Sequence, residues 1–162
     1  QHKSVRSRKM ANLEPGKKAP AFNLLDQDEN KVQLKDYSGK KLLIYFYPKA
    51  NTSGWTRQSC AVSDAIPNLG KLNVAAVGIS PDKPAAQKKF DEKYELGFPL
   101  LSDPDKEIAR KYGALGIKNV RGQKKEGIVR SSFLIDEKGK IIEAWYKVKP
   151  EDTVPKALEA LK

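Results

Sequence analysis

The sequence predicts an α/β fold with a mixed central β-sheet flanked by helices, and three observations lead to this class. Residues 41–47 (KLLIYFY) are almost all apolar, which is typical of a central strand covered on both faces. Residues 73–79 (NVAAVGI) form a second apolar strand, beyond a stretch with helical periodicity. A hairpin pattern around Gly139 adds antiparallel strands near the C-terminus, so we expect the sheet to be mixed.

The predicted elements begin with an N-terminal β-hairpin. Residues 22–25 and 32–34 have the character of strands, and the polar residues 26–31 separate them. The central strand over residues 41–47 follows. We expect Pro48 to end it, because proline lacks the N–H that a sheet ladder needs.

Three helices are expected in the middle of the chain. Thr52 or Ser53 is suited to cap a helix over residues 55–69, in which apolar side chains recur at helical spacing. A proline in the first turn favours a second helix over residues 84–94. An Asp-Pro pair indicates the start of a shorter helix over residues 103–112.

The C-terminal part is predicted to form a hairpin and a last helix. Strands over residues 131–136 and 141–146 flank a turn in which Gly139 is available for a positive φ angle. A final helix covers residues 152–161. The complete order is a hairpin, then alternating strands and helices, then a second hairpin and a helix, which fits a thioredoxin-like architecture.

Length and charge indicate one domain with a basic surface. A chain of 162 residues can bury a core without disulfides, and we expect one domain over residues 10–162. Residues 1–9 carry four basic side chains and no apolar stretch, and Met10 fits a natural start, so we expect a flexible tail or an expression remnant before it. The net charge of +11 can attract polyanions, but no recognition motif accompanies it, so we expect no nucleic-acid partner.

Cysteine and histidine usage excludes several kinds of site. The one cysteine, Cys60, allows neither an internal disulfide nor a cysteine-ligated zinc cluster. The one histidine, His2, lies in the tail, which excludes histidine general-base catalysis and His-ligated metals. No apolar run reaches the ~20 residues of a membrane span, so we expect no membrane partner. A single cysteine without a signal peptide predicts a cytoplasmic location.

One short segment points to a particular chemistry. Pro48 is followed by Thr52 four residues later, and three residues after that by Trp55, near the start of the predicted helix. Free N–H groups and the helix dipole would lower the pKa of a thiol at position 55. Trp55 itself has no nucleophilic atom, and Cys60 lies five residues further on.

Four stretches share the order and spacing of one protein family. They are PGKKAPAF at 15–22, YFYP at 45–48 leading to Asn51 and Thr52, GISPD at 78–82, and RSSFLID at 130–136. With them, residues 13–161 resemble the bacterioferritin-comigratory, or Q-type, peroxiredoxins.

The resemblance implies a peroxidase that reduces hydrogen peroxide and organic hydroperoxides. In that family a thiolate at the position of Trp55 attacks the peroxide and becomes a sulfenic acid, which a thiol at the position of Cys60 converts to a disulfide. Thr52 and Arg130 would bind and polarise the peroxide, and Pro48 would shield the pocket from water. Thioredoxin or a glutaredoxin-like protein supplies electrons, no cofactor or metal takes part, and a monomer is expected.

Helix geometry adds a requirement to such a reaction. Residues 55 and 60 on one helix are ~7.5 Å apart along its axis and point in different directions. A disulfide needs Cα atoms within ~7 Å of each other. Two thiols at these positions could therefore bond only if the first turns of the helix unwound.

Three explanations are open for Trp55. It can replace a cysteine or a selenocysteine, since the Trp codon is one base from both Cys codons and from UGA, and some peroxiredoxins of this kind carry selenocysteine there. It can mark a natural pseudo-enzyme, a non-catalytic thioredoxin-fold module for binding or regulation. The third explanation transfers the peroxidase role to Cys60, where the helix dipole has largely faded. Under the first two explanations, this chain is expected to be inactive, because Trp55 replaces the peroxidatic residue.

Overall fold

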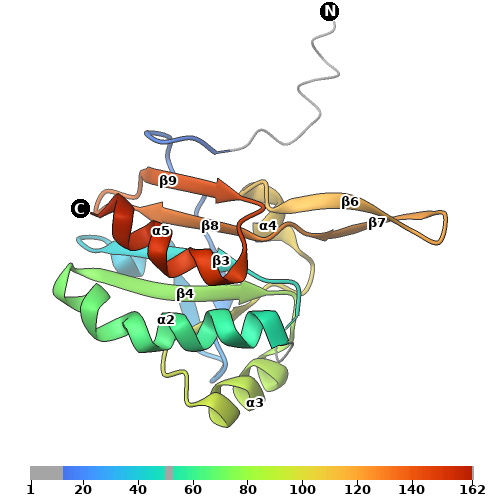
Figure 1. Ribbon diagram of the computed structural model, residues 1–162, viewed down its shortest axis with the longest axis horizontal. Coiled ribbons are helices and arrows are strands. Elements are labelled where there is room, and N and C mark those ends of the chain that lie inside the picture. The colour runs from blue at the N-terminus through green and yellow to red at the C-terminus, as the bar shows by residue number, and fades with distance from the viewer. Residues whose placement is uncertain (1–12, 50–52, 162) are drawn as a thin grey trace, which may run out of the picture.

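The computed structural model describes residues 13–49 and 53–161, and a seven-stranded mixed sheet is at its centre (Figure 1). The strand order is β2-β1-β5-β4-β3-β8-β9. Strands β3, β4 and β5 are parallel, whereas β8 runs antiparallel to β3 and pairs with β9. The bounds are β1 Asn23–Leu25, β2 Lys31–Gln33, β3 Lys41–Phe46, β4 Val74–Ser80, β5 Leu100–Ser102, β8 Ser131–Ile135 and β9 Ile141–Tyr146. The predicted mixed α/β sheet is confirmed.

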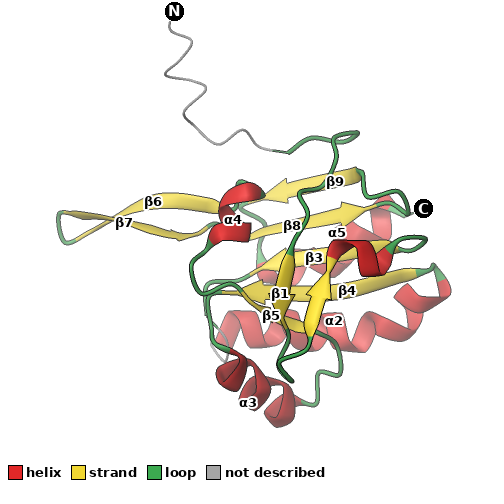
Figure 2. Ribbon diagram, turned by 180° about the vertical axis from the view of Figure 1, so that it is seen from behind, coloured by secondary structure: helices red, strands yellow, loops and turns green. Residues whose placement is uncertain are grey.

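Helices cover both faces of this sheet. The long helix α2 lies with α3 and α5 on one face, and η1 and α4 lie on the other (Figures 1 and 2). Their bounds are η1 Leu34–Tyr37, α2 Ser53–Lys71, α3 Pro84–Tyr94, α4 Glu107–Lys111, η2 Pro150–Asp152 and α5 Thr153–Ala160. In the described part of the chain, no helix has the length and apolar character that crossing a membrane requires.

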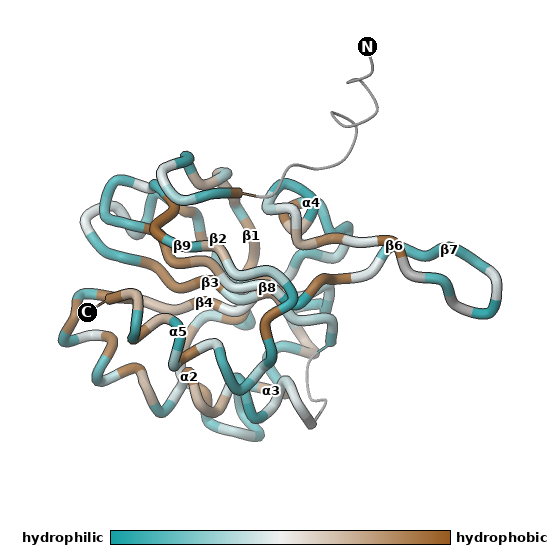
Figure 3. Tube along the Cα trace, turned by 45° about the horizontal axis from the view of Figure 1, so that its top comes forward, coloured by the Kyte–Doolittle hydropathy of each residue, from teal (hydrophilic) through white to brown (hydrophobic). Residues whose placement is uncertain are grey.

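The central strand β3 divides the core into two layers. Its side chains at even positions pack against η1 and α4, whereas those at odd positions, with Tyr47, pack against α2, α3 and α5. This alternation follows from the two-residue period of a strand. Residues 42–47 are all at most 1% exposed, and Figure 3 shows apolar residues along β3. The central apolar strand predicted from the sequence is therefore confirmed.

Two helices begin more than one residue away from their predicted starts. Helix α2 already includes Ser53, so Ser53 is not its cap, and the other predicted cap, Thr52, lies outside the described residues. The short helix α4 begins at Glu107 and not at 103. The carboxylate of Asp103 accepts the backbone N–H groups of Ile108 (3.3 Å) and Ala109 (3.0 Å) from outside the helix. Asp103 therefore acts as an anion at the helix N-terminus, which favours the helix without belonging to it.

Three strands have no counterpart in the sequence prediction. Strand β5 is only three residues long and lies between β1 and β4. Strands β6 (Leu115–Val120) and β7 (Gln123–Ile128) form a separate two-stranded antiparallel sheet, which projects from the body of the molecule (Figure 1). Residues 123–127 are exposed or half-buried, so their sequence lacks the apolar alternation by which strands are recognised.

Candidate functional site

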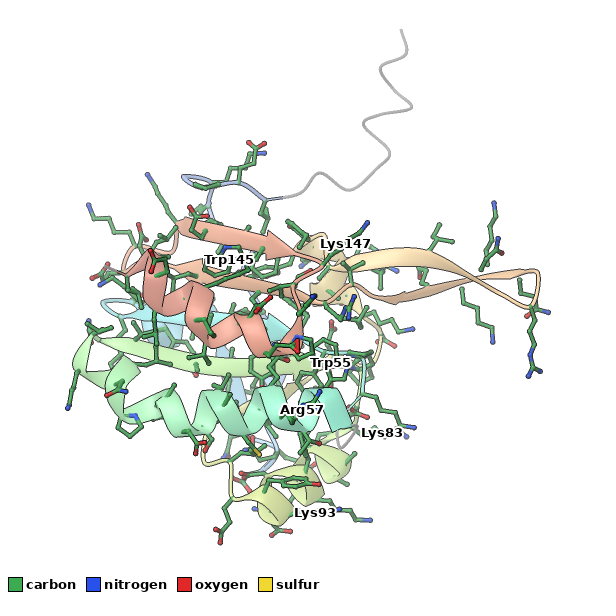
Figure 4. All side chains as sticks on the ribbon, in the orientation of Figure 1. Trp55, Arg57, Lys83, Lys93, Trp145 and Lys147 are labelled. Atoms are coloured by element: carbon green, nitrogen blue, oxygen red, sulfur yellow. The ribbon has the colours of Figure 1, made fainter. Side chains whose placement is uncertain are left out.

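Position 55 lies in the first turn of α2, directly beyond the C-terminal end of β3. Trp55 is 9% exposed and belongs to the core layer that contains Tyr45 and Tyr47 (Figure 4). The strand ends at Phe46, and the chain returns to the sheet with α2 from Ser53 onward. The side chain at position 55 is thus held at the N-terminal end of a long helix, against the central strand.

Cys60 lies on the same unbroken helix as Trp55. Its thiol is free and half-buried, and it packs against the same core layer. Burial raises the pKa of Cys60, and the nearby carboxylate of Asp64 raises it further. At neutral pH the thiol is therefore protonated, and its nucleophilic form is scarce.

We predict that Asp64→Asn makes Cys60 more reactive. Removing the negative charge lowers the pKa of the thiol and leaves the larger effect of burial in place, so the midpoint of the pH–rate profile shifts to lower pH. Alkylation by iodoacetamide at pH 8, followed by mass spectrometry, should accelerate by about twofold. Asp105→Asn, another exposed carboxylate, is the control and should change nothing. An unchanged midpoint in Asp64→Asn would contradict the electrostatic cause.

The structure places Pro48 and Arg130 at the same edge of the sheet. Ser131, the first residue of β8, pairs with Phe46 at the end of β3, so Arg130 lies one residue before this pair and Pro48 two residues after it. Both are exposed. The carbonyl of Arg130 accepts the N–H of Val148 at 2.9 Å, which ties this backbone to the segment after β9. Thr52, the remaining predicted site residue, lies outside the described residues.

Buried hydrogen bonds hold the second turn of α2 to the sheet and to α5. The Tyr45 hydroxyl and Ser59 Oγ are 2.7 Å apart, and both residues are fully buried. Gln58 Nε2 donates to Thr153 Oγ1 at 2.5 Å, and Thr153 Oγ1 lies 3.3 Å from Ser132 Oγ. Within the described residues, Gln58 Oε1 is buried without a hydrogen-bond partner. One buried acceptor thus loses its hydration in the closed helix without compensation.

A second chain of buried hydrogen bonds connects β3 with α3. The Tyr47 hydroxyl donates to Gln87 Oε1 at 2.6 Å, and Gln87 Nε2 donates to Ser80 Oγ at 3.0 Å. Ser80 Oγ in turn donates to Asp82 Oδ2 at 2.7 Å. Burial raises the pKa of the Tyr45 and Tyr47 phenols, so both remain protonated. These side chains therefore position neighbouring elements and do not act as bases.

Sequence reasoning missed these polar anchors. Tyr45 and Tyr47 stand two residues apart in the strand predicted over residues 41–47, which places both hydroxyls on the same face. That spacing was the one available signal, because nothing local marks their partners Ser59 and Gln87 as buried. No group of three or more His, Cys, Asp or Glu side chains suited to a metal occurs in residues 13–49 and 53–161.

Comparisons with known proteins show the family to which this chain belongs. Residues 15–144 match the AhpC/TSA family. The chain is 46% identical over 148 residues to a putative peroxiredoxin of Mycobacterium tuberculosis, covering 91% of this chain and 94% of that protein. It is 46% identical over 129 residues to the peroxiredoxin Bcp of Escherichia coli, covering 80% and 83%. The chain is a peroxiredoxin of the Bcp group.

Solved structures of Q-type peroxiredoxins have the same fold. The peroxiredoxin Q of Xanthomonas campestris matches with a TM-score of 0.83 and 32% identity, over 86% of this chain and 89% of that one. The PrxQ of Xylella fastidiosa matches with a TM-score of 0.86 and 28% identity, over 93% and 96%. The resemblance stated from the sequence and the thioredoxin-like fold are thus confirmed. Membership of this family implies a peroxide substrate and a thioredoxin-like reductant.

Proposed function

We propose that this peroxiredoxin is a scaffold for thioredoxin-dependent peroxide reduction in which position 55 is the peroxidatic position and Cys60 is the resolving thiol. The observation that carries the proposal is the location of Trp55 in the first turn of α2, on the same helix as the only thiol of the chain. With an indole in place of a thiol or selenol, the chain lacks the attacking atom and is expected to be inactive. Replacement of Trp55 by cysteine tests the proposal through peroxide consumption.

The electrostatics of this edge support a thiolate at position 55. A helix N-terminus carries free N–H groups and a partial positive charge, which lower the pKa of a nearby thiol. Arg130 reaches the surface at the same edge, and none of the ion pairs among residues 13–49 and 53–161 involves it. An arginine without an acidic partner is available to stabilise the charge that develops on a peroxide oxygen.

The surroundings of position 55 also influence which peroxides could be substrates. Trp55 packs in an apolar core layer, so a smaller side chain there would leave an apolar space. The related bacterioferritin comigratory protein of Xanthomonas campestris has an alkyl peroxide reduction activity. We infer that this chain, with a thiol at position 55, would accept organic hydroperoxides as well as hydrogen peroxide.

Resolution by Cys60 would require the first turns of α2 to unwind. Residues 55 and 60 lie on one continuous helix, in which a disulfide between them cannot form. The bonds from Tyr45 to Ser59 and from Gln58 to Thr153 oppose unwinding, whereas the unpaired Gln58 Oε1 favours it, since opening would hydrate it.

We predict that Ser59→Ala accelerates disulfide formation in a Trp55→Cys protein by about fivefold, which corresponds to ~1 kcal/mol. The substitution leaves the buried Tyr45 hydroxyl unpaired only while the helix is closed, so the closed state is destabilised relative to the open one. Quenched-flow mass spectrometry would follow the sulfenic acid as it converts to the disulfide with Cys60.

Ser63→Ala is the matched control for this experiment. Ser63 is on the same helix and donates to the Leu96 carbonyl at 2.6 Å, but it lies beyond Cys60 and outside the segment that must open. The rate of disulfide formation in the Ser63→Ala variant should equal that in the Trp55→Cys parent. Equal acceleration by both substitutions, or none by Ser59→Ala, would exclude the Tyr45–Ser59 bond as a brake on opening.

The close packing of the indole favours a second candidate function. A side chain that is 9% exposed and surrounded by the core stabilises the closed form of α2. A non-catalytic peroxiredoxin scaffold that binds a partner would benefit from such a helix. The two candidates differ in the Trp55→Cys protein, since a binding scaffold would stay inactive.

A further inference from the structure

The β6–β7 hairpin, which we call the basic arm (residues 115–128), is built as a projecting ribbon with an anchored root. Leu115 and Ile128 pair at its root and are 6% and 4% exposed, within the core layer formed with η1 and α4. Beyond the root the arm leaves the body and becomes hydrophilic toward its tip (Figures 1 and 3). Its sheet contains only β6 and β7, so each of these strands pairs on one side alone.

The basic arm carries more positive than negative charge. Lys118, Arg121, Lys124 and Lys125 are its basic residues, and Glu126 is its one acidic residue. Glu126 is already occupied, because Arg110 of α4 pairs with it at 3.1 Å. Arg121, Lys124 and Lys125 are exposed, and none of the ion pairs found in residues 13–49 and 53–161 involves them.

The turn at the tip of the arm has an arginine at a position where a small residue is usual. Arg121 and Gly122 form a two-residue turn with φ angles of 52° and 79°. Asparagine, aspartate or glycine normally occupies the first of these positions, because a positive φ is unfavourable for larger side chains. A cation is thus placed at the outermost point of the arm at a conformational cost.

The basic arm also starts beside the proposed site. Ile128 ends β7 two residues before Arg130, and β8 then begins opposite the end of β3. The arm projects from the end of the molecule where Trp55 lies, with the labelled side chain of Lys147 near its root (Figure 4). A protein that reaches position 55 from this end would therefore come close to the arm.

We propose that the basic arm is the docking surface for the acidic face of the dithiol protein that reduces this peroxiredoxin; the identity of this partner rests on the proposed function. The chemistry that recognises the partner is charge complementarity, with Ile117, 71% exposed on the arm, as an apolar contact among the cations. A nucleic acid is the competing polyanion, but the arm combines its cations with an apolar side chain and no base-stacking aromatic residue.

A kinetic experiment in a Trp55→Cys background tests the arm. The arm variant combines Arg121→Asn, Lys124→Gln and Lys125→Gln; asparagine suits the positive φ, so the hairpin keeps its fold. The KM for an acidic thioredoxin should rise about tenfold at low ionic strength, and the difference should shrink with added salt. The kcat, and the turnover with dithiothreitol as reductant, should not change.

The matched control removes the same charge from the opposite end of the sheet. It combines Lys18→Gln, Lys35→Gln and Lys138→Gln, three exposed lysines around a groove beside Leu42, at the start of β3. Its KM for thioredoxin should equal that of the parent. An equal rise in the KM of both variants would mean that net charge alone causes the effect. That result, or an unchanged KM in the arm variant, would overturn the proposal.

Two further measurements separate this proposal from the proposed function. Absence of turnover with dithiothreitol in the folded Trp55→Cys protein would contradict the peroxidase proposal alone. Binding of a fluorescently labelled acidic thioredoxin to the Trp55 chain, measured by anisotropy, needs no turnover and should weaken about tenfold in the arm variant. Arm-dependent binding of a labelled DNA duplex, with thioredoxin binding unchanged, would instead assign the arm to nucleic acid and overturn the proposal.

Discussion

Replacing Trp55 with cysteine is expected to turn this peroxiredoxin, which we expect to be inactive with the indole, into a thioredoxin-dependent peroxidase. The new thiol would lie in the first turn of α2, where the helix dipole and N–H groups favour the thiolate, with Arg130 at the same edge. Cys60 would then close the cycle through a disulfide. We expect turnover on the order of 1–10 s⁻¹, against none above background with Trp55. Peroxide consumption coupled to thioredoxin oxidation measures it.

Stability does not prevent this experiment. Loss of a buried indole costs about 3 kcal/mol, which is less than the 5–15 kcal/mol that holds a typical domain folded. Circular dichroism should therefore show a folded variant with a lowered Tm. A further Cys60→Ser substitution should limit the protein to about one peroxide reduced per chain without thioredoxin oxidation, because the sulfenic acid then lacks the thiol with which it forms the disulfide. A folded Trp55→Cys protein that consumes no peroxide would refute the peroxidase proposal and favour the binding scaffold.

Phe133→Ala is expected to lower the free energy of unfolding by about 4 kcal/mol and the Tm by roughly 10 °C. Phe133 is fully buried in β8, with its ring centroid 5.8 Å from that of Phe46, 5.2 Å from Tyr112 and 5.4 Å from Tyr146. Truncation leaves a cavity between three aromatic rings that cannot readily collapse. Urea unfolding measures the loss.

Two comparisons make this second result specific. Ile117→Ala, at a position that is 71% exposed, should change the free energy of unfolding by less than about 0.5 kcal/mol. Phe133→Leu should recover a large part of the loss, since it refills most of the cavity. A loss below 1 kcal/mol in Phe133→Ala would mean that the aromatic layer contributes little to holding β8 against β3, and with it the backbone before Ser131.

The local elements of this fold were predictable because their signals are local. Each signal lies in the segment whose structure it predicts. Examples are the apolar run of β3, the proline at the start of α3 and the turn at Gly139. The basic arm was not predictable in this way, since it projects into solvent and residues 123–127 of β7 show no apolar alternation. The start of α4 was also missed, because Asp103 binds the helix N–H groups from outside.

The candidate site was also predictable only in part, from its local signals. The spacing of Pro48, Thr52 and position 55 indicated the family, and the comparisons confirm that family; the roles of these residues remain predictions. Only the tertiary structure brings Arg130 to the edge where β3 ends, because the pairing of Ser131 with Phe46 joins residues 85 positions apart. It also reveals the bond from Tyr45 to Ser59, which no local pattern announces.

The sequence by itself therefore determined the fold class, the family and the anomaly at Trp55, because these depend on residue type and short-range spacing. Tertiary structure decided that the indole is buried, that α2 is unbroken through Cys60 and that the basic arm projects beside the site. The physical reason is that the spacing of apolar residues along the sequence indicates only which side of a helix or strand is buried. Register, packing and projection arise from contacts between residues far apart in the chain, which no short segment encodes.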